Sequence, residues 1–316
     1  MNPTPANYPQ ILVIGSMNMD LVLRSQHFPK PGESIQGGDL HQIPGGKGAN
    51  QAVAAARLGA KVTMMGAVGD DAMGRELIRN LRRDRINTRW IDTIEDAPTG
   101  VAVILLNAKG ENQIVTSPGA NGCVTPGHIE KSKKVMNKAH LIILQNEIPL
   151  PAIRAAVQQA RKLDIPVIYN LAPASRVPRT LLRQLTAVIV NETEAETVLG
   201  FSVRSERSAR RAIRELAMTV RGEIAVLTLG ARGALIAQGS EVRFQPAFTA
   251  RVVDTTAAGD AFVGAFGVQF LKLGDPFEAC RWACAAGGVA VTRLGAQISL
   301  PSRQELNQLL TSRRKR

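Results

Sequence analysis

Short apolar runs alternate with amphipathic helical patterns along most of the chain, and this alternation constrains the fold more than any other feature. Each run has the length of a buried strand, and the segments between the later runs have the spacing of helices. Such β-α-β alternation predicts a doubly wound α/β fold, with a mainly parallel sheet and helices on both of its faces. The apolar runs are residues 11–14, 62–68, 141–144, 166–168, 187–190 and 224–228, and the helical patterns are residues 151–163, 192–199, 206–220 and 261–274.

Two segments interrupt this alternation and show extended patterns without helical spacing. They cover about residues 21–43 and 97–118 and contain the turn signals PKPGE and NAKGEN. We expect them to form a small β-sheet that is inserted as a lid into a single domain of residues 1–316. Residues 311–316 are interpreted as a basic tail.

With 316 residues, of which 45% are hydrophobic, the chain is long enough to bury a sizeable core. The N-terminal segment lacks the basic and apolar parts of a signal peptide, and no apolar run approaches the roughly 20 residues that span a bilayer. We therefore expect a soluble, cytoplasmic protein without a membrane partner. Cys123, Cys280 and Cys284 match no zinc spacing, and their odd number argues against a disulfide framework, so we interpret them as reduced core residues.

The net charge of +13 raises the hypothesis of a nucleic-acid partner, because clustered basic side chains neutralise phosphates. The internal clusters, at residues 82–85 and 204–214, fall on amphipathic patterns and are interpreted as solvated helix faces. The cluster at residues 313–316 has the composition of a frayed end. No recognisable nucleic-acid module accompanies the charge, so a nucleic-acid partner is disfavoured.

Polar residues follow two of the apolar runs, where an open α/β sheet binds its ligands. The motif GSMNMD places Asn18 and Asp20 after the first run, and QNEIP places Glu147 after residues 141–144. An amide and a carboxylate together suit a polyhydroxy ligand, because they both donate to and accept from hydroxyl groups. The alternatives are an ordinary Asx turn for the first motif and capping or pairing at a strand end for Glu147.

The stretch PGGKGANQAVAAARLG joins a glycine-rich turn to an alanine-rich helix. Gly46 and Gly48 allow the backbone to approach a ligand closely. The stretch lacks the arrangement of a P-loop, because Gly48 follows Lys47 where Ser or Thr is required. A sugar fits better, with Lys47 and Asn50 as donors to its oxygens. A glycine-rich turn closed by a surface lysine is the alternative.

Two further motifs, NETEAETVLG and TLGARG, suit a nucleotide site. Acidic residues in the first turn of a helix interact favourably with its dipole, which alone explains them structurally. Mg²⁺ also prefers carboxylates, so Glu192, Glu194 and Glu196 are candidate ligands, directly or through water. TLGARG places two glycines at a strand end, where they suit a phosphate or ribose contact.

The stretch DTTAAGDAF opens a helix with residues that have little or no side chain. The backbone N–H groups of Ala257, Ala258 and Gly259 are expected to converge on one anion. Asp260 beside such an anion hole is placed to take a proton from an attacking hydroxyl. Capping of the helix is the structural alternative for an aspartate, and we expect Asp260 to do both.

These stretches, GGKGANQAVAAARLG and DTTAAGDAFVGAF, closely resemble the two signatures of the ribokinase family of carbohydrate kinases. NMD, NETEAE, TLGARG and VTRLGAQ occur in the family's order, so the resemblance covers about residues 11–310. It implies transfer of the γ-phosphoryl group of MgATP to the hydroxyl at carbon five of D-ribose. It also implies activation by K⁺ and a homodimer formed through the lid.

The resemblance assigns roles to individual positions. The sugar site comprises Asn18, Asp20, Gly46, Lys47, Gly48, Asn50 and Glu147, with Asp260 as the base and Ala257, Ala258 and Gly259 as the anion hole. The ATP site comprises Asn191, Thr228, Gly230, Gly233, Gly259 and Cys284. The potassium site comprises Asp254, Thr256, Ala290, Arg293, Gly295 and Ser299, and Glu194 is the candidate magnesium ligand.

Four positions depart from the family pattern, and they leave the sugar preference and nucleotide affinity open. Gln145 and Asn146 precede Glu147 where the family varies, Ala261 follows the base where a hydroxyl residue is frequent, and Cys284 lies at the expected adenine pocket. Alternatives are therefore a 2-deoxyribose kinase, or a kinase for another sugar or a nucleoside. A noncatalytic sugar-sensing or nucleic-acid-associated protein is the alternative of another class.

Overall fold

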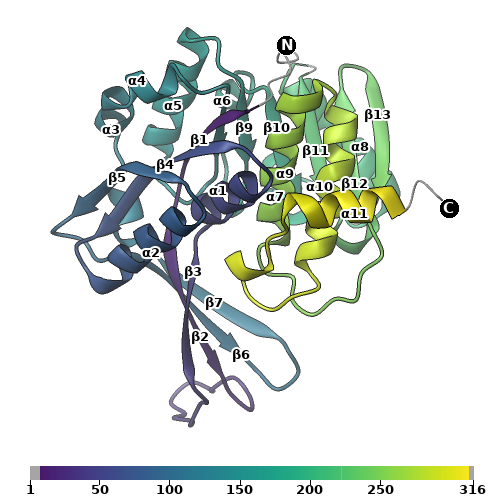
Figure 1. The fold of residues 1–316 in the computed structure, drawn as a ribbon. Coiled ribbons are helices and arrows are strands. Elements are labelled where there is room, and N and C mark those ends of the chain that lie inside the picture. The colour runs from purple at the N-terminus through teal and green to yellow at the C-terminus, as the bar shows by residue number, and fades with distance from the viewer. Residues whose placement is uncertain (1–7, 222, 313–316) are drawn as a thin grey trace.

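The computed structural model describes residues 8–221 and 223–312, and in this part of the chain it contains a nine-stranded and a four-stranded sheet (Figure 1). The large sheet is parallel from β5 to β11, while β12 and β13 are antiparallel. Its strand order is β13 (Glu241–Pro246), β12 (Gly233–Gln238), β11 (Ile224–Thr228), β10 (Ala187–Asn191), β9 (Val167–Asn170), β8 (Leu141–Leu144), β1 (Gln10–Ile14), β4 (Lys61–Gly69) and β5 (Asn87–Ile94). The predicted mainly parallel α/β fold is thereby confirmed.

Helices cover both faces of the large sheet, because alternate residues of each strand point to opposite sides. Ile11 and Val13 of β1 belong to one hydrophobic core, and Leu12 and Ile14 belong to the other. The first face carries α1 (Lys47–Arg57), α2 (Ala72–Arg83), α9 (Ala258–Leu273), α10 (Pro276–Ala290) and α11 (Arg303–Ser312). The second carries α3 (Pro126–Lys131), α4 (Lys133–Met136), α5 (Leu150–Lys162), α6 (Arg179–Leu182), α7 (Glu192–Leu199) and α8 (Glu206–Thr219).

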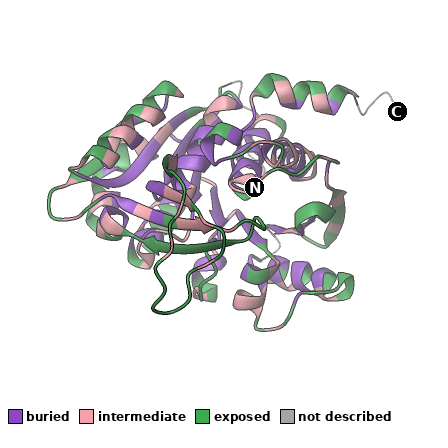
Figure 2. Cartoon of the chain, turned by 90° about the horizontal axis from the view of Figure 1, so that it is seen from below, coloured by how far each residue is buried: buried purple, intermediate pink, exposed green. Residues whose placement is uncertain are grey.

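The small sheet projects from the large one and has the order β3 (Leu40–Gly45), β2 (Asn18–Arg24), β6 (Gly100–Leu106) and β7 (Asn112–Ser117). Its strands lie in the two segments that interrupt the alternation, but β2 begins at Asn18, so the GSMNMD motif already enters this sheet. Figure 2 shows its strands largely exposed or intermediate, and β7 is exposed throughout. The basic cluster at residues 313–316 lies outside the described residues.

The strand order places a topological switch point at β1. From β1 the chain reaches β4 and β5 on one side, and β8 to β11 on the other. Ligands of open α/β sheets bind beyond the carboxyl ends of the strands at such a point. The segments that follow β1 and β8 therefore border the expected crevice. Within residues 8–221 and 223–312, none of the helices has both the length and the apolarity needed to cross a bilayer.

Helices α1 and α9 pack closely through a glycine. A Cβ atom on Gly264 would lie 2.5 Å from the Cβ of Ala54 and 3.0 Å from the backbone nitrogen of Ala55. Because α1 begins at Lys47 and α9 contains Asp260, this packing fixes the distance between two groups of the candidate site.

We expect Gly264→Ala to lower the free energy of unfolding by about 1–3 kcal/mol, because the added methyl group overpacks the interface of α1 and α9. Helix propensity alone favours alanine by up to about 1 kcal/mol. Gly259→Ala in the same helix is the control, since a Cβ atom there meets nothing within 4 Å. Urea unfolding of both variants measures the difference, and equal stabilities would contradict the packing argument.

Candidate active site

At the switch point, the carboxyl edge of the sheet holds one lysine among several carboxylates. Lys47 begins α1, Asp20 lies on β2, Glu147 follows β8, and Asp260 lies in the first turn of α9. Burial by itself lowers the pKa of Lys47, but Asp260, Glu147, Glu194 and Asp20 together raise it above its ordinary value. Lys47 is therefore held in its charged form, and the structure brings these predicted site residues together.

Asp20 is buried in this cluster, and 8% of the residue is exposed. Burial raises its pKa to about 7, and repulsion by Glu147 and Asp260 adds to the rise, while Lys47 opposes it. A carboxyl group with this pKa binds a proton near neutral pH or accepts hydrogen bonds from a ligand that supplies hydroxyl groups.

The structure contradicts the expectation that Asp260 caps its helix. The N-cap of α9 is Ala257, in the left-handed conformation with φ 58° and ψ 9°, and it makes no side-chain cap. Asp260 instead turns toward α1, where its Oδ2 accepts from Asn50 Nδ2 at 2.9 Å and its Oδ1 accepts from Gln51 Nε2 at 2.9 Å. Burial raises the pKa of Asp260, against the opposing effects of Lys47 and these two amides.

Glu147 anchors the start of α1. Its Oε2 accepts from the backbone nitrogen of Lys47 at 3.1 Å and from the hydroxyl group of Ser16, whose Oγ also accepts from the backbone nitrogen of Gly48 at 3.3 Å. The structural alternative for Glu147, pairing at a strand end, is thus observed. The Oε1 atom of Glu147 takes part in neither of these hydrogen bonds.

The glycines of the GGKG turn are required by the protein's own backbone. Gly46 has φ 88°, and a Cβ atom there would lie 2.6 Å from the backbone nitrogen of Asn18. A Cβ atom on Gly48 would lie 2.6 Å from the backbone nitrogen of Ser16. The turn before α1 therefore packs directly against the segment that follows β1, which places Lys47 next to Asn18.

A buried asparagine that the sequence did not reveal holds Asn18. The Nδ2 atom of Asn121 donates to Asn18 Oδ1 at 2.8 Å and to the Met17 carbonyl at 3.1 Å, and its Oδ1 accepts from the Met17 backbone nitrogen at 2.9 Å. Asn121 comes from the 3-10 turn η1 (Gly119–Cys123) after β7. No pattern in this turn signals the contact, because Asn18 lies 103 residues away along the chain.

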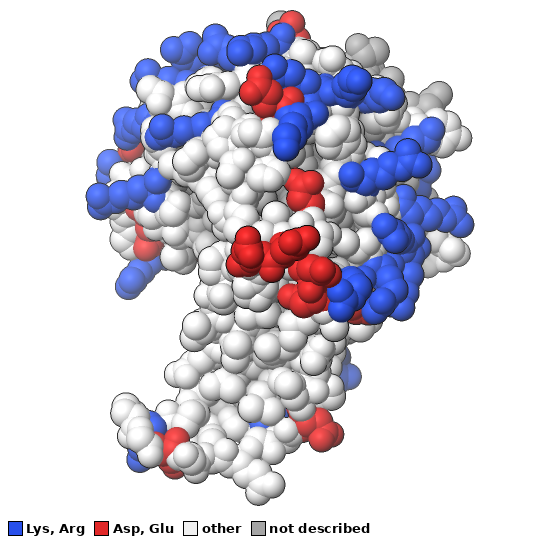
Figure 3. Space-filling model, turned by 90° about the vertical axis from the view of Figure 1, so that its left-hand side faces the viewer, with Lys and Arg blue, Asp and Glu red and all other residues white. Residues whose placement is uncertain are grey.

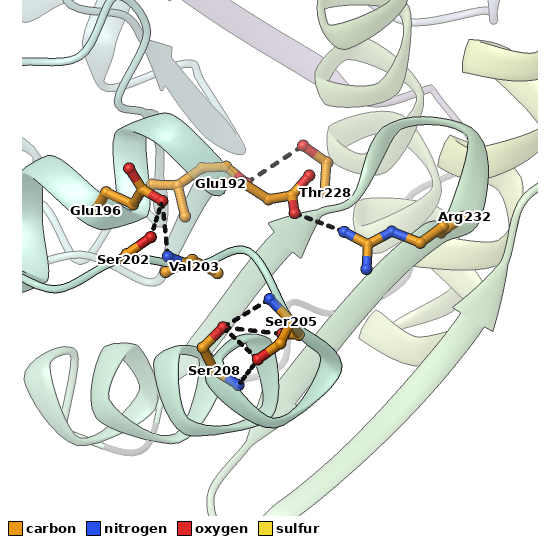
Figure 4. Close-up of polar contacts among 9 residues, drawn as sticks. Glu192, Glu196, Ser202, Val203, Ser205, Ser208, Thr228 and Arg232 are labelled. Carbon is orange, nitrogen blue, oxygen red and sulfur yellow. Dashed lines mark hydrogen bonds and ion pairs between the residues drawn. The ribbon is translucent and has the colours of Figure 1, made fainter.

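Glu194, at the start of α7, interacts electrostatically with Lys47 and Asp260 of the cluster. Asn191 caps α7. The Glu194 carboxylate accepts two hydrogen bonds from Asn191, one from its backbone nitrogen at 2.8 Å and one from its Nδ2 at 2.9 Å. Burial raises the pKa of Glu194 to about 6; Asn191 and Lys47 lower it, and Asp260 raises it. Glu196 accepts instead from Ser202 and from the Val203 backbone (Figure 4).

The TLGARG turn lies beside α7. Thr228 pairs in register with Asn191 on the neighbouring strand, and its Oγ1 donates to the Val190 carbonyl at 3.3 Å. Glu192 accepts from Arg232 at 2.5 Å across the gap between the two segments, as Figure 4 shows. Glu192, one of the candidate magnesium ligands, is thus engaged in a partly exposed ion pair.

Two of the remaining predicted ATP residues, Gly233 and Cys284, meet at β13. Gly230 has φ 56°, and Gly233 has φ 119° with no room for a side chain, because a Cβ atom would lie 2.1 Å from the Gln245 carbonyl. Cys284 of α10 is buried, with its Sγ 4.0 Å from the same carbonyl. Gly233 and Cys284 are thus neighbours across Gln245.

The predicted potassium residues lie on the loop before α9 and on the segment from the end of α10 to Ser299, and Asp254 joins the two. Its Oδ1 accepts from the backbone nitrogen and hydroxyl of Thr256 at 2.9 and 2.7 Å, and its Oδ2 accepts from the backbone nitrogen of Gly295 at 2.8 Å. Burial by itself raises the pKa of Asp254, but these bonds lower it overall. The Arg293 guanidinium pairs with Glu305, which directs its charge away from the loops.

Two further observations concern where a metal ion or a ligand can bind. Among the residues that the structure describes, no three His, Cys, Asp or Glu side chains are grouped so as to hold a metal ion. A hollow of about 930 Å³ lies at the opposite, amino-terminal edge of the sheet, where Gln10, Lys61 and Trp90 help to line it. None of the predicted site residues lines that hollow, so the chemistry is assigned to the carboxyl edge.

The site combines a buried aspartate with amide, ammonium and carboxylate side chains at a helix start that has no side-chain cap. A model of the pfkB family carbohydrate kinases matches residues 9–303, and the chain belongs to this family. The family resemblance of the two signature stretches is thereby confirmed.

Known relatives agree with this membership. A ribokinase of Haemophilus influenzae is 37% identical over 95% of this chain and 98% of its own length. A deoxyribokinase of Salmonella typhi is 36% identical over 95% of this chain and 98% of its own. The structure of an Arabidopsis thaliana ribokinase complexed with ribose and ATP superimposes with a TM-score of 0.89 and 29% identity, over 96% of this chain and 99% of that one.

We expect Asp20→Asn to reduce the pH dependence of stability between about pH 4 and pH 7. In that window the folded protein keeps a proton on Asp20 that the unfolded chain, with a pKa near 3.8, releases. The free energy of unfolding therefore falls as pH rises, by on the order of 1 kcal/mol per pH unit from this group. Urea unfolding at several pH values measures the slope. Exposed Asp39→Asn is the control, and an equal slope in Asp20→Asn and wild type would contradict the assignment.

Proposed function

We propose that this carbohydrate kinase phosphorylates D-ribose at the hydroxyl on carbon five, with MgATP as the donor. The observation that supports the proposal most is the position of Asp260, between the hydroxyl-binding cluster and the uncapped start of α9. The ribose hydroxyl gives its proton to Asp260, its oxygen bonds to the γ-phosphorus, and the bond to the β–γ bridging oxygen breaks to release ADP. Such transfers depend on positioning and charge neutralisation more than on covalent catalysis.

Each predicted group has a part in this scheme. Asn18, Asp20, Asn50 and Glu147 bind the sugar hydroxyls, with Lys47 as a donor from the start of α1. Backbone N–H groups of Ala257, Ala258 and Gly259 stabilise the charge that develops on the transferring group. Asn191, Thr228, Gly230, Gly233 and Cys284 border the nucleotide.

The second candidate substrate is 2-deoxyribose. It is favoured by the deoxyribokinase relative, whose 36% identity differs little from the 37% of the ribokinase relative. The two sugars differ only in the hydroxyl at carbon two, so the preference depends on whether a buried polar group of the site is left without a partner.

Mg²⁺ accompanies ATP in this scheme and neutralises phosphate charge when it is bound. Glu194 suits a contact with it, because its carboxylate is buried near Lys47 and Asp260 and keeps lone pairs beyond the two bonds to Asn191. A single carboxylate suits an ion that keeps most of its ligands as water and phosphate oxygens.

K⁺ is proposed to bind between the two loops that Asp254 joins, mainly through backbone oxygens of the predicted residues. The loops are tied together at Asp254 and Gly295, and the Val253 backbone nitrogen donates to the Val291 carbonyl at 2.7 Å. The pairing of Arg293 with Glu305 removes a competing positive charge from this place. Ser299 is buried on the adjoining turn.

Release of ADP by the purified protein tests the proposed function, with ribose and 2-deoxyribose each compared in potassium and in sodium. We expect ribose-dependent turnover that potassium stimulates. Preference for 2-deoxyribose would keep the mechanism and change the substrate. No turnover with any pentose, hexose or nucleoside, together with salt-sensitive DNA binding, would favour the noncatalytic alternative.

Asp260→Asn is expected to lower kcat by roughly 10²-fold or more, as loss of a positioned base does.

We also propose that two copies of the chain associate through the small sheet. Leu21, Val103 and Val115 lie side by side on three adjacent strands, and Val103 and Val115 are exposed. Figure 3 shows the projecting sheet as largely uncharged, whereas basic side chains are spread over the rest of that face. An apolar exposed face of this kind is typical of a protein interface.

The double substitution Val103→Asp and Val115→Asp is expected to give a monomer, because it places charges in the centre of the proposed interface. Sedimentation velocity of wild type and variant measures the mass. The control is Phe244→Asp, which alters an exposed apolar side chain on β13. A wild-type monomer at assay concentration would contradict the proposal.

A further inference from the structure

Three buried amide side chains form a hydrogen-bonded group that contacts Asp260 through Gln51. Gln51 and Gln145 are 0% exposed and Asn170 is 8% exposed. They come from α1, from the end of β8 and from the end of β9. Buried amides require hydrogen-bond partners, so their orientation is a structural question with a definite answer.

The contacts of Asn170 fix the first orientation. Its Nδ2 lies 3.1 Å from the Ile189 carbonyl, which only accepts. The nitrogen of Asn170 must therefore face Ile189, and its Oδ1 must face Gln51. Gln51 Nε2 lies 3.0 Å from that oxygen, so it is the nitrogen of Gln51 that points this way.

The orientation of Gln51 then determines its other contacts. The second hydrogen of its Nε2 reaches Asp260 Oδ1 at 2.9 Å, and its Oε1 accepts from Gln145 Nε2 at 2.7 Å. Rotation of the Gln51 amide by half a turn would place its oxygen against the Asp260 carboxylate and against the Asn170 oxygen. The chain from Ile189 through Asn170 to Gln51, supported by Gln145, thus allows one orientation.

The two oxygens of Asp260 are consequently not equivalent. Oδ1 faces Gln51, whose two hydrogens are both engaged, whereas Oδ2 accepts from Asn50, a residue of the proposed sugar site. The Oδ1 atom of Asn50 is buried without a protein partner. Asn50 and Oδ2 therefore form the side that a sugar hydroxyl reaches.

We propose that Gln51 is a positioning residue, which holds Asp260 Oδ1 and so presents Oδ2 to the proton of the substrate, and that Asn170 and Gln145 set its orientation. This inference rests on the proposed function for its catalytic meaning, while the contact itself is independent of it. It also gives a reason for a glutamine directly after Asn50, because the two residues of α1 hold different oxygens of Asp260.

The charged groups that face Asp260 determine the expected pH effect. Lys47 stabilises its ionised form, and Glu147, Asp20 and Glu194 oppose that form. Burial raises the pKa of Asp260, and the donated bonds of Asn50 and Gln51 lower it. Removal of the Gln51 donor therefore raises the pKa of Asp260 further. Because turnover needs the ionised Asp260, activity then starts to fall at a higher pH as the solution is acidified.

Gln51→Met tests the proposal, because methionine has a similar length and donates no hydrogen bond. We expect the acid limb of the kcat/KM profile to move up by about one pH unit, the equivalent of one hydrogen bond to a charged group, with kcat lowered roughly tenfold and the ribose KM changed less. Gln145→Met, which removes the support of Gln51, is expected to shift the limb in the same direction by less. Gln269→Met is the control, since it removes another buried glutamine, in α9.

A second measurement does not depend on activity. The ¹³C signal of the Asp260 carboxyl, assigned with Asp260→Asn, is titrated in wild type, Gln51→Met and Gln269→Met. A higher midpoint in Gln51→Met alone supports the contact, even if the wild type shows no sugar-dependent turnover and the proposed function fails. An unchanged midpoint and an unchanged acid limb in Gln51→Met overturn the inference, whatever happens to kcat.

Discussion

The site depends on one ammonium group among four carboxylates. Lys47 interacts with Asp260, Glu147, Glu194 and Asp20, and their combined charge outweighs its own. Such a cluster is costly to desolvate, and the pKa values of about 7 for Asp20 and about 6 for Glu194 show that part of the excess negative charge is removed by protonation. An uncharged polyhydroxy ligand suits this cluster, because its hydroxyl groups replace water on the carboxylates without adding charge.

The glycines around Lys47 connect this cluster to the small sheet. Gly46 and Gly48 pack against the backbone of the segment that leads into β2, and β3 ends at Gly45, directly before them. Asn18 and Asp20 lie on β2 itself. A displacement of the small sheet would therefore move hydroxyl-binding side chains and the start of α1 together. This coupling gives a physical reason for a sheet that projects from the domain and is poorly buried, but begins inside the site.

The sequence predicted those features that depend on local pattern. The helix at residues 192–199 was predicted with its observed bounds. The polar motifs were predicted beyond the ends of their strands, and the strand order places these ends at the switch point. The group of buried amides that contacts Asp260 was not predicted, because its members are far apart in the sequence. Gln51 is 209 residues from Asp260 and 94 residues from Gln145. Local pattern also gave the wrong role to Asp260 as a cap, because it carries no sign that Ala257 adopts a left-handed backbone.

That backbone is informative because alanine is strained by it. A left-handed conformation costs a residue with a Cβ atom roughly 1–2 kcal/mol. Arg85, Asp164 and Arg221 also adopt it, but they follow the ends of helices, whereas Ala257 precedes the start of one. Helices α2, α7, α8 and α10 begin with side-chain caps from Asp71, Asn191, Ser205 and Asp275. Helix α9 has an aspartate in its first turn and does not use it in this way. The turn at Ala257 sends Asp260 to the amides of α1 and leaves the first N–H groups of α9 without a side-chain cap, beside the open space at Gly259. The Ala258 backbone nitrogen donates to the Thr255 carbonyl at 3.3 Å, so this amide is already engaged within the turn. The start of a helix attracts an anion, and the strained turn at Ala257 agrees with the phosphoryl site proposed there.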